Sequence, residues 1–436
     1  MTKLPKSLLA VTLAMLLSPA AEAVGLLDVY RQALDSDPDL RAAGSSRLAA
    51  LEVKPQARAL LLPQVSATLR QSHDFGVDSA RTPSSFDSHN YDISISQPLF
   101  RQESLVRQRQ AEHQVTQAEA DYANVQQDLV LRVAINYFAV LAAQDNLTFA
   151  TAEKEAIARQ LEQAKRRFEV GLATITDVQE AQAGYDRAVS QEIDARQLLA
   201  DAYEALRQLT GQRYERINVL KKEIPLELPR PTDPEAWVGM ALEKNLDIAS
   251  ASASVEVARE EINRQKAGHY PSVDLVASHY DTDSGVSAGD ADGNTIGIQV
   301  SIPLYQGGAV LSRTREAAYN YEASKERLES LQRTTTRQVR NAYRGVETGI
   351  SQVKALKQAV ISSRSSLEAT QAGYEVGTRT IVDVLLAQRT LYQTERDYER
   401  SRYDYLINRL RLFQAAGQLD EQDLQEIDRY LQKPAN

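Results

Sequence analysis

The chain has 436 residues, no cysteine, and 59 acidic against 50 basic side chains, which gives a net charge of −9 at pH 7. This balance argues against a nucleic acid or an anionic membrane surface as partner, because both favour clustered Lys and Arg. Without cysteine we expect no disulfide, no thiolate metal site and no lipid-anchored cysteine. Long segments rich in Ala, Gln, Arg and Glu and nearly free of Gly and Pro are typical of long helices.

The N-terminus has the three regions of a secretory signal peptide. Two lysines precede an apolar run at 8–17, and a small-residue triplet follows at 21–23. We therefore expect residues 1–23 to be removed and the mature chain to begin at Val24. No later run reaches the ~18 to 20 apolar residues that a membrane-spanning helix needs. Any segment that crosses a membrane is therefore expected to be a strand.

The rest of the chain consists of two copies of one unit, about 206 residues apart. Several short motifs recur in the same order in both copies, which indicates an internal duplication. The clearest pairs are Leu62-Pro63 with Tyr270-Pro271, Gln97-Pro98-Leu99 with Ile302-Pro303-Leu304, and Phe168-Glu-Val170-Gly171 with Tyr374-Glu-Val376-Gly377.

The duplication predicts four parts in the mature chain. The first structural repeat covers 24–212 and the second covers 236–417. Between them, residues 213–235 contain four prolines, which disfavour both helix and strand pairing and indicate a linker. Residues 418–436 form a non-repeating C-terminal tail.

Four segments, two in each repeat, are expected to form strands. An apolar–polar alternation of period two predicts strands with one apolar and one polar face. We expect each strand to be about 8 to 10 residues long, as for a tilted strand that crosses an outer membrane. The segment from Val273 to Tyr280 is the weakest, because Val276 interrupts its alternation. The apolar positions of the other three are Val65, Ala67, Leu69, Tyr91, Ile93, Ile95, Ile296, Ile298, Val300 and Ile302.

Two very long helices are expected, from about 103 to 167 and from 308 to 374, each roughly 100 Å long at ~1.5 Å per residue. Two adjacent apolar stripes on the first helix predict contacts with helices on two sides. In the last helix, apolar and tyrosine side chains recur every seven residues, as in the seam of a coiled coil. They are Val384, Leu391, Tyr398, Tyr405 and Leu412.

These elements are incomplete in a single chain. Four strands are too few to close a barrel, since the smallest single-chain barrels have about eight. Unpaired backbone groups at strand edges cannot face lipid without a large energetic cost. The two-sided helices also leave apolar surface uncovered. We therefore expect copies of the chain to combine, with a strand barrel in the membrane continued by a helical barrel in the periplasm.

Two sequence segments carry a family resemblance. The segment from Tyr374 to Leu385 with Tyr403-Asp-Tyr-Leu-Ile-Asn408, and its counterpart from Gly171 to Gln179, resemble the signatures of the TolC family of outer-membrane efflux and secretion channels. The resemblance covers essentially the whole mature chain. The missing N-terminal cysteine makes the chain more similar to the unlipidated members of type I secretion than to the lipoprotein efflux members.

The resemblance implies a fold that is mainly α with a small β part. It implies a homotrimer, with a 12-stranded transmembrane β-barrel, a long α-helical coiled-coil barrel, and an equatorial band made from the linker and the tail. It also implies docking to a periplasmic adaptor protein and an inner-membrane transporter, ABC-type or proton-driven. The expected location is the outer membrane, in contact with its lipid and extending into the periplasm.

The turns between the long helices contain the candidate gate residues. Phe168 and Ala173 of the first copy are replaced by Tyr374 and Arg379 in the second. By family resemblance, Tyr374 and Arg379 latch the second helix pair to Thr176 and Asp177 of the first. A second interpretation stays open, in which Asp177 only caps its own helix and Arg379 is solvated. A surface ion pair alone would contribute only ~0 to 1 kcal/mol.

A ring of carboxylates is the second candidate site. Asp383 matches a position that in the family contributes to an acidic ring at the periplasmic entrance. It too fits a capping box, after Thr380. The second acidic position of the family is Leu386 here, which argues against strong cation selectivity. Three copies of Asp383 would supply three carboxylates.

The sequence carries no signature of an enzyme, such as Gly-x-Ser-x-Gly, a phosphate-binding loop or His-Glu-x-x-His. We therefore predict no catalytic residue, no cofactor and no metal site. The predicted function is an exit duct for type I protein secretion, multidrug efflux or both. The alternative is a membrane-anchored structural coiled-coil stalk, which the strands in both halves disfavour because a stalk needs only one anchor. The choice of cargo belongs to the pump.

Overall fold

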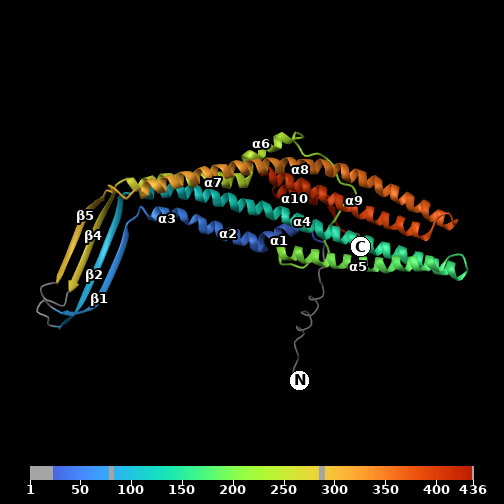
Figure 1. Ribbon diagram of the computed structural model, residues 1–436, viewed down its shortest axis with the longest axis horizontal. Coiled ribbons are helices and arrows are strands. Elements are labelled where there is room, and N and C mark those ends of the chain that lie inside the picture. Colours follow the sequence, from blue (N-terminus) through green and yellow to red (C-terminus); the bar gives the residue numbers. More distant parts are fainter. Residues whose placement is uncertain (1–22, 78–82, 284–289, 435–436) are drawn as a thin grey trace, which may run out of the picture. The chain divides into compact units, whose positions relative to one another are not determined.

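The computed structural model describes residues 23–77, 83–283 and 290–434 (Figure 1). Residues 1–22 of the expected signal peptide lie outside this part. The described chain is mainly helical, and its two longest helices are α4 (Gln102–Glu169) and α8 (Ala309–Glu375). Both agree with the helices expected from the sequence to within two residues at each end. No helix in the described ranges is both long and apolar enough to span a bilayer.

The chain forms two compact units, and each contains segments of both sequence halves. Unit 1 comprises Met1–Arg41, Val125–Asn245 and Thr335–Asn436, and unit 2 comprises Ala42–Asn124 and Leu246–Thr334. The remaining helices are α1 (Leu26–Ser36), α2 (Pro38–Leu51), α3 (Val53–Ala59), α5 (Ile175–Thr210), α6 (Pro234–Lys244), α7 (Leu246–Lys266), η1 (Ala267–His269), α9 (Ile381–Ala415) and α10 (Glu421–Asp428).

Unit 2 contains an antiparallel sheet with the strand order β1-β2-β4-β5, seen side by side in Figure 1. All four expected strands form, including the weakly patterned β4. They have 11 to 18 residues, longer than the expected 8 to 10, because pairing continues into polar segments beyond the apolar alternation. The strands are β1 (Gln64–Val77), β2 (Pro83–Phe100), β4 (Ser272–Asp283) and β5 (Ala291–Ser301).

One face of this sheet is apolar and exposed. Val65 pairs with Ile95, Ile95 with Ala277, and Ala277 with Ile296, so the apolar side chains of all four strands share a face. Val65 is 68% exposed and Ile296 78%. The other face is polar: serine hydroxyls meet across β1 and β2 at 2.9 Å (Ser66 with Ser94). The register therefore produces the two-faced sheet that the sequence pattern predicts.

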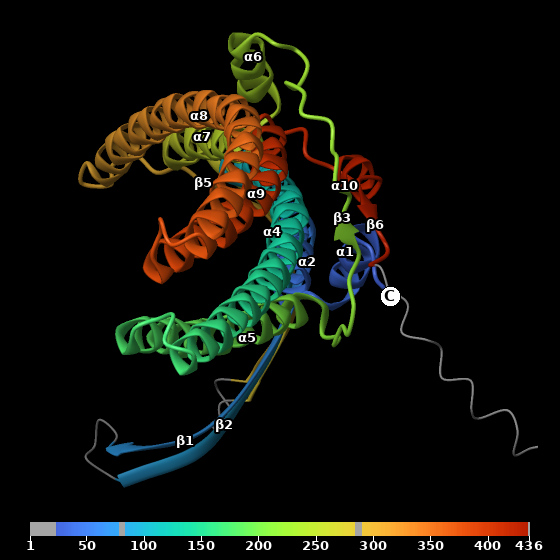
Figure 2. The ribbon, with the colours of Figure 1, turned by 90° about the vertical axis from the view of Figure 1, so that its right-hand side faces the viewer.

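In unit 1 helix α1, the linker and the C-terminal tail pack together (Figure 2). β3 (Val219–Leu220) of the linker pairs with β6 (Leu431–Gln432) of the tail. The first turn of α1 has no capping side chain of its own, and its Leu26 N–H donates to Asp428 Oδ1 of α10 at 2.8 Å. The tail thus satisfies a free amide at the start of the first helix.

Candidate gate at the helix tips

Two turns define what we call the tip of unit 1: residues 170–174 between α4 and α5, and residues 376–380 between α8 and α9. In each turn a glycine adopts a left-handed conformation, with φ of 77° at Gly171 and 81° at Gly377. A side chain with a Cβ rarely adopts this φ, so glycine ends both long helices. The backbone of the duplicated unit is the same at both turns.

Both turns start the next helix with a capping box. The amide N–H of Asp177 donates to Thr174 Oγ1 at 3.2 Å, and that of Thr174 donates to Asp177 Oδ2 at 2.8 Å. Asp383 and Thr380 form the same pair at 3.3 and 2.9 Å. The capping interpretation of both aspartates is therefore confirmed. Each carboxylate already satisfies backbone donors of its own helix.

The carboxyl group of Asp383 has a lowered pKa. The main causes are the hydrogen bonds from the backbone N–H and the hydroxyl of Thr380, and the charge of Arg379 adds to them. One turn further along α9 lies Leu386, at the second acidic position implied by the family resemblance. Its side chain is 61% exposed. Asp383 is therefore a charged carboxylate at neutral pH with an apolar neighbour.

Tyr374 lies in the core that joins the tips of the two helix pairs. It is 8% exposed, whereas its counterpart Phe168 in the first copy is 44% exposed. Corresponding positions of the two copies therefore have opposite environments. The side chains that form this tip core are Leu161, Ala164, Val178, Ala181, Tyr374, Ile381 and Val384.

Arg167 is a contact of Tyr374 that the sequence did not predict. Its guanidinium carbon lies 4.8 Å from the centre of the Tyr374 ring, in the geometry of a cation–π contact between α4 and α8. Burial raises the pKa of the Tyr374 hydroxyl, Arg167 opposes this, and Asp177 adds to it. No sequence signal indicates this pair, because the two residues lie far apart along the chain and match no motif.

The four predicted latch residues are only partly brought together. Asp177 lies close enough to Tyr374 to influence its pKa. The Tyr374 hydroxyl is buried and has no hydrogen-bond partner among the described residues. Thr176 and Arg379 are both exposed. In the described part of the chain, Asp177 hydrogen-bonds to Thr174 of its own turn, and Arg379 forms no hydrogen bond or ion pair with Thr176 or Asp177.

Arg379 instead lies along its own turn. A Cβ placed on Gly373 would meet Arg379 Cγ at 2.7 Å, so the absence of a side chain at 373 makes room for the stem of this arginine. The amide N–H of Arg379 donates to the carbonyl of Gly373 at 3.2 Å. Arg379 is therefore an exposed residue whose stem lies against its own turn.

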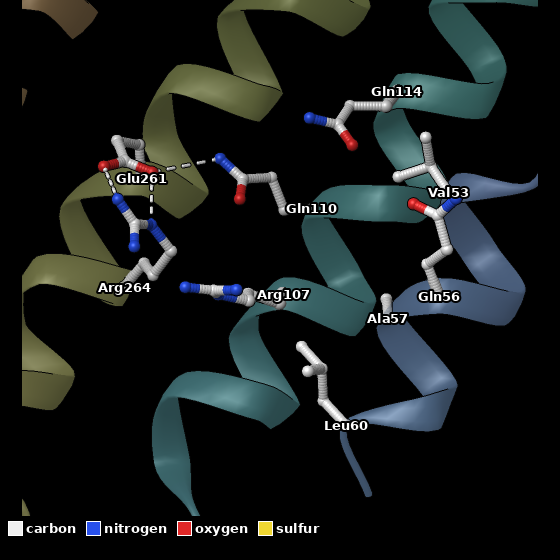
Figure 3. Close-up of a pocket in the computed structure, with 9 residues that line it drawn as sticks. All are labelled: Val53, Gln56, Ala57, Leu60, Arg107, Gln110, Gln114, Glu261 and Arg264. Atoms are coloured by element: carbon white, nitrogen blue, oxygen red, sulfur yellow. Dashed lines mark hydrogen bonds and ion pairs between the residues drawn. The ribbon is translucent and has the colours of Figure 1, made fainter. Parts of the chain in front are cut away.

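A pocket of about 500 Å³ in unit 2 lies between α3, α4 and α7 (Figure 3). Its charged groups are already paired. Arg264 contacts Glu261 at 2.6 Å and Glu103 at 3.1 Å, and Arg107 contacts Glu103 at 2.7 Å. Gln110 also donates to Glu261, whose pKa falls to about 2, chiefly through the hydrogen bond from Arg264. These groups stabilise helix packing.

Comparisons with known proteins agree over nearly the whole chain. A family model described as outer membrane efflux protein matches residues 29–212 and 237–418. The chain is 40% identical over 418 residues to the outer membrane protein TolC of Vibrio cholerae, which covers 94% of this chain and 95% of that one. It is 32% identical over 425 residues to the alkaline protease secretion protein AprF of Pseudomonas aeruginosa, with 95% and 88% covered.

The fold is also that of a solved structure, the outer membrane protein VceC from Vibrio cholerae. The TM-score is 0.76 at 19% identity, with 90% of this chain and 96% of that chain covered. Long paired helices joined to a sheet with an exposed apolar face define an outer-membrane channel. The chain belongs to the outer membrane efflux protein family. It lies in the outer membrane, extends into the periplasm and provides an exit duct.

Proposed function

We propose that the chain acts as a homotrimer whose strands close one 12-stranded barrel. The observation that carries this proposal is the four-stranded sheet, which has one exposed apolar face and outer strands, β1 and β5, with one neighbour each among the described strands. A lipid-facing sheet must pair its edges, and four strands are too few to do so alone. Three copies supply twelve strands.

The helices of unit 1 support the same assembly. Apolar side chains on α5 and α8 are exposed in the single chain, with Ile193 at 59%, Leu198 at 55% and Ile361 at 54%. Contact between these helices of adjacent copies would bury them and close the helical wall. The burial of this apolar surface stabilises the trimer by the same hydrophobic effect that folds each chain.

The domain organisation within the trimer follows the duplication. Residues 24–212 and 236–417 are the two structural repeats, a division supported by the two separate family matches. The linker 213–235 and the tail 418–436 form the equatorial band, supported by the pairing of β3 with β6. Residues 1–23 direct export and are removed.

The duct works with an inner-membrane pump and a periplasmic adaptor, because the described chain carries no signature of an energy source. The relative named for alkaline protease secretion supports a secreted protein as one class of cargo. Small-molecule efflux uses the same kind of duct, so the pump determines which cargo passes.

The gate lies at the tip of the second helix pair. Tyr374 and Arg379 latch this pair in the closed state, with Thr176 and Asp177 as the facing groups, and Asp383 forms a ring of three carboxylates. The buried Tyr374 hydroxyl, which has no partner among the described residues, and the exposed Arg379 support a latch that is completed between protomers. No cofactor takes part.

The purified protein tests this proposal directly. Native mass spectrometry in detergent is expected to give three copies of the chain, and insertion into a planar bilayer is expected to give ion-conducting steps. A structural stalk would insert without conducting. A monomer, or a trimer that never conducts, contradicts the exit-duct function.

A further inference from the structure

α4 and α9 contact each other along an antiparallel seam, which we define as residues 138–164 of α4 and 384–410 of α9. The rings of Phe138 and Tyr403 stack with their centres 5.6 Å apart. The Tyr403 hydroxyl donates a hydrogen bond to Asp145 Oδ2 at 2.6 Å. Since α4 belongs to the first helix pair and α9 to the second, this seam connects the two pairs.

An ion pair forms the next polar layer of the seam toward the tip. Arg396 Nη1 lies 3.1 Å from Glu153 Oε2, and Glu153 is 2% exposed. A first separation too small to admit water would leave a buried carboxylate without its counter-charge, which is strongly unfavourable. The seam from Phe138 to the Glu153–Arg396 pair therefore resists opening.

A layer of two glutamines follows, and its side-chain oxygens are unpaired in the described chain, whereas the charged groups of the ion-pair layer are paired. Gln160 lies one heptad beyond Glu153 on α4, and Gln388 lies eight residues before Arg396 on α9, so the antiparallel register places them at one level. Gln388 is 3% exposed, and the Oε1 atoms of both glutamines have no hydrogen-bond partner among the described residues. Buried acceptors without partners are costly, and water would satisfy them if the seam opened.

The tip core continues this trend. The hydroxyl of Tyr374 in this core is also buried without a partner in the described ranges. The two polar layers farther from the tip are satisfied, whereas both the glutamine layer and the tip core would gain hydrogen bonds from water on separation. The polar contribution to the free-energy cost of opening the seam therefore falls between Glu153 and Gln160.

We propose that the gate hinges at this point, between the Glu153–Arg396 ion pair and the Gln160–Gln388 layer. The part of the seam from Phe138 to the ion pair stays closed. Between the ion pair and the tip, the second helix pair bends away from the first. Glu153 and Arg396 are positioning residues for the gate. This inference rests on the proposed exit-duct function.

Pairs of engineered cysteines test the position of the hinge, and the natural chain adds no competing thiol. The lower pair is Arg167→Cys with Tyr374→Cys, where the natural side chains are in contact. The upper pair is Glu153→Cys with Arg396→Cys, placed in a channel that also carries Tyr374→Phe and Arg379→Ser. A short bis-thiosulfonate reagent bridges each pair, and dithiothreitol releases it.

The two bridges are expected to act differently on single-channel conductance in a planar bilayer. Bridging the lower pair should abolish the open state reversibly. Bridging the upper pair should leave the raised conductance unchanged. A loss of conductance with the upper bridge would overturn the proposed hinge position, as would an unchanged conductance with the lower bridge. Absence of any conductance in every variant would contradict the exit duct itself.

The glutamine layer has its own matched test. Gln160→Leu with Gln388→Leu removes the two unsatisfied acceptors and should strengthen the closed seam, so that the unlatched channel loses most of its conductance increase. Gln393→Leu, an exposed glutamine on the same helix, is the control and should change nothing. A double variant that opens as freely as the control would overturn the role of this layer.

Discussion

The two tip turns have the same backbone but different side-chain environments. Both have a left-handed glycine and a capping box with the same hydrogen bonds. Yet Phe168 is 44% exposed in the first copy, whereas Tyr374 is 8% exposed in the second. The comparison teaches that the duplication preserved the residues that determine the local fold, while the residues of the proposed gate changed in one copy only.

The largest expected effect comes from removing the features unique to the second copy. Tyr374→Phe with Arg379→Ser should raise the open-to-closed ratio of the trimer about ten-fold, which corresponds to ~1.4 kcal/mol. Single-channel conductance in a planar bilayer measures this change. Phe168→Leu in the first copy is the matched control and should leave the conductance at its natural value.

The single variant Tyr374→Phe sharpens this prediction. Within one protomer it removes a buried hydroxyl that has no partner in the described part of the chain, which by itself should stabilise the tip core. A raised conductance would therefore require a partner from a neighbouring copy. A higher melting temperature with unchanged conductance would exclude the hydroxyl from the latch.

The second effect concerns Asp145, which joins the two helix pairs through Tyr403. Burial raises the pKa of Asp145 to about 6, above the ~3.9 of an unfolded aspartate. Its contribution to stability is therefore present below pH ~3.9 and lost as the pH rises through about 6. Asp145→Asn keeps the acceptor without the charge. It should raise stability by about 1 to 2 kcal/mol at pH 7.5 and change little at pH 4, as measured by thermal unfolding in detergent.

The capping boxes should respond equally in the two copies. Thr174→Ala and Thr380→Ala each remove a hydrogen bond at a helix start, at a cost of about 1 kcal/mol. Thr380→Ser keeps the hydroxyl and is the control. Thermal unfolding of the trimer should show losses of similar size. A loss confined to one copy would contradict the conclusion that both turns use the same local fold.

The smallest effect is expected at the ring of Asp383. Its pKa is lowered, so its contribution to stability is present above the unfolded value and lost as the pH falls through the folded one. Asp383→Asn should slightly reduce cation selectivity, measured as the reversal potential in a salt gradient. Leu386→Asp should increase selectivity, because it adds a carboxylate one turn further on. An unchanged reversal potential in both variants would place these residues outside the ion path.

Signals that act within a few residues predicted much of this structure. The capping threonines and the glycines Gly171 and Gly377 located the helix ends, and the alternation around Val65 identified a strand with its exposed face. The contact of Arg167 with Tyr374 and the bond of Tyr403 to Asp145 join distant segments, and no local pattern encodes them. The two compact units were also missed, because each is built from both halves of the sequence.

A deletion strain tests the central claim most directly. Its culture supernatant is compared with that of the parent for missing proteins, and its growth is measured in detergents and dyes. The exit-duct account predicts that at least one property changes and that the natural chain restores it. Loss of a few secreted proteins would identify a secretion duct, and broad sensitivity would identify an efflux duct. An unchanged supernatant together with unchanged resistance would contradict the account.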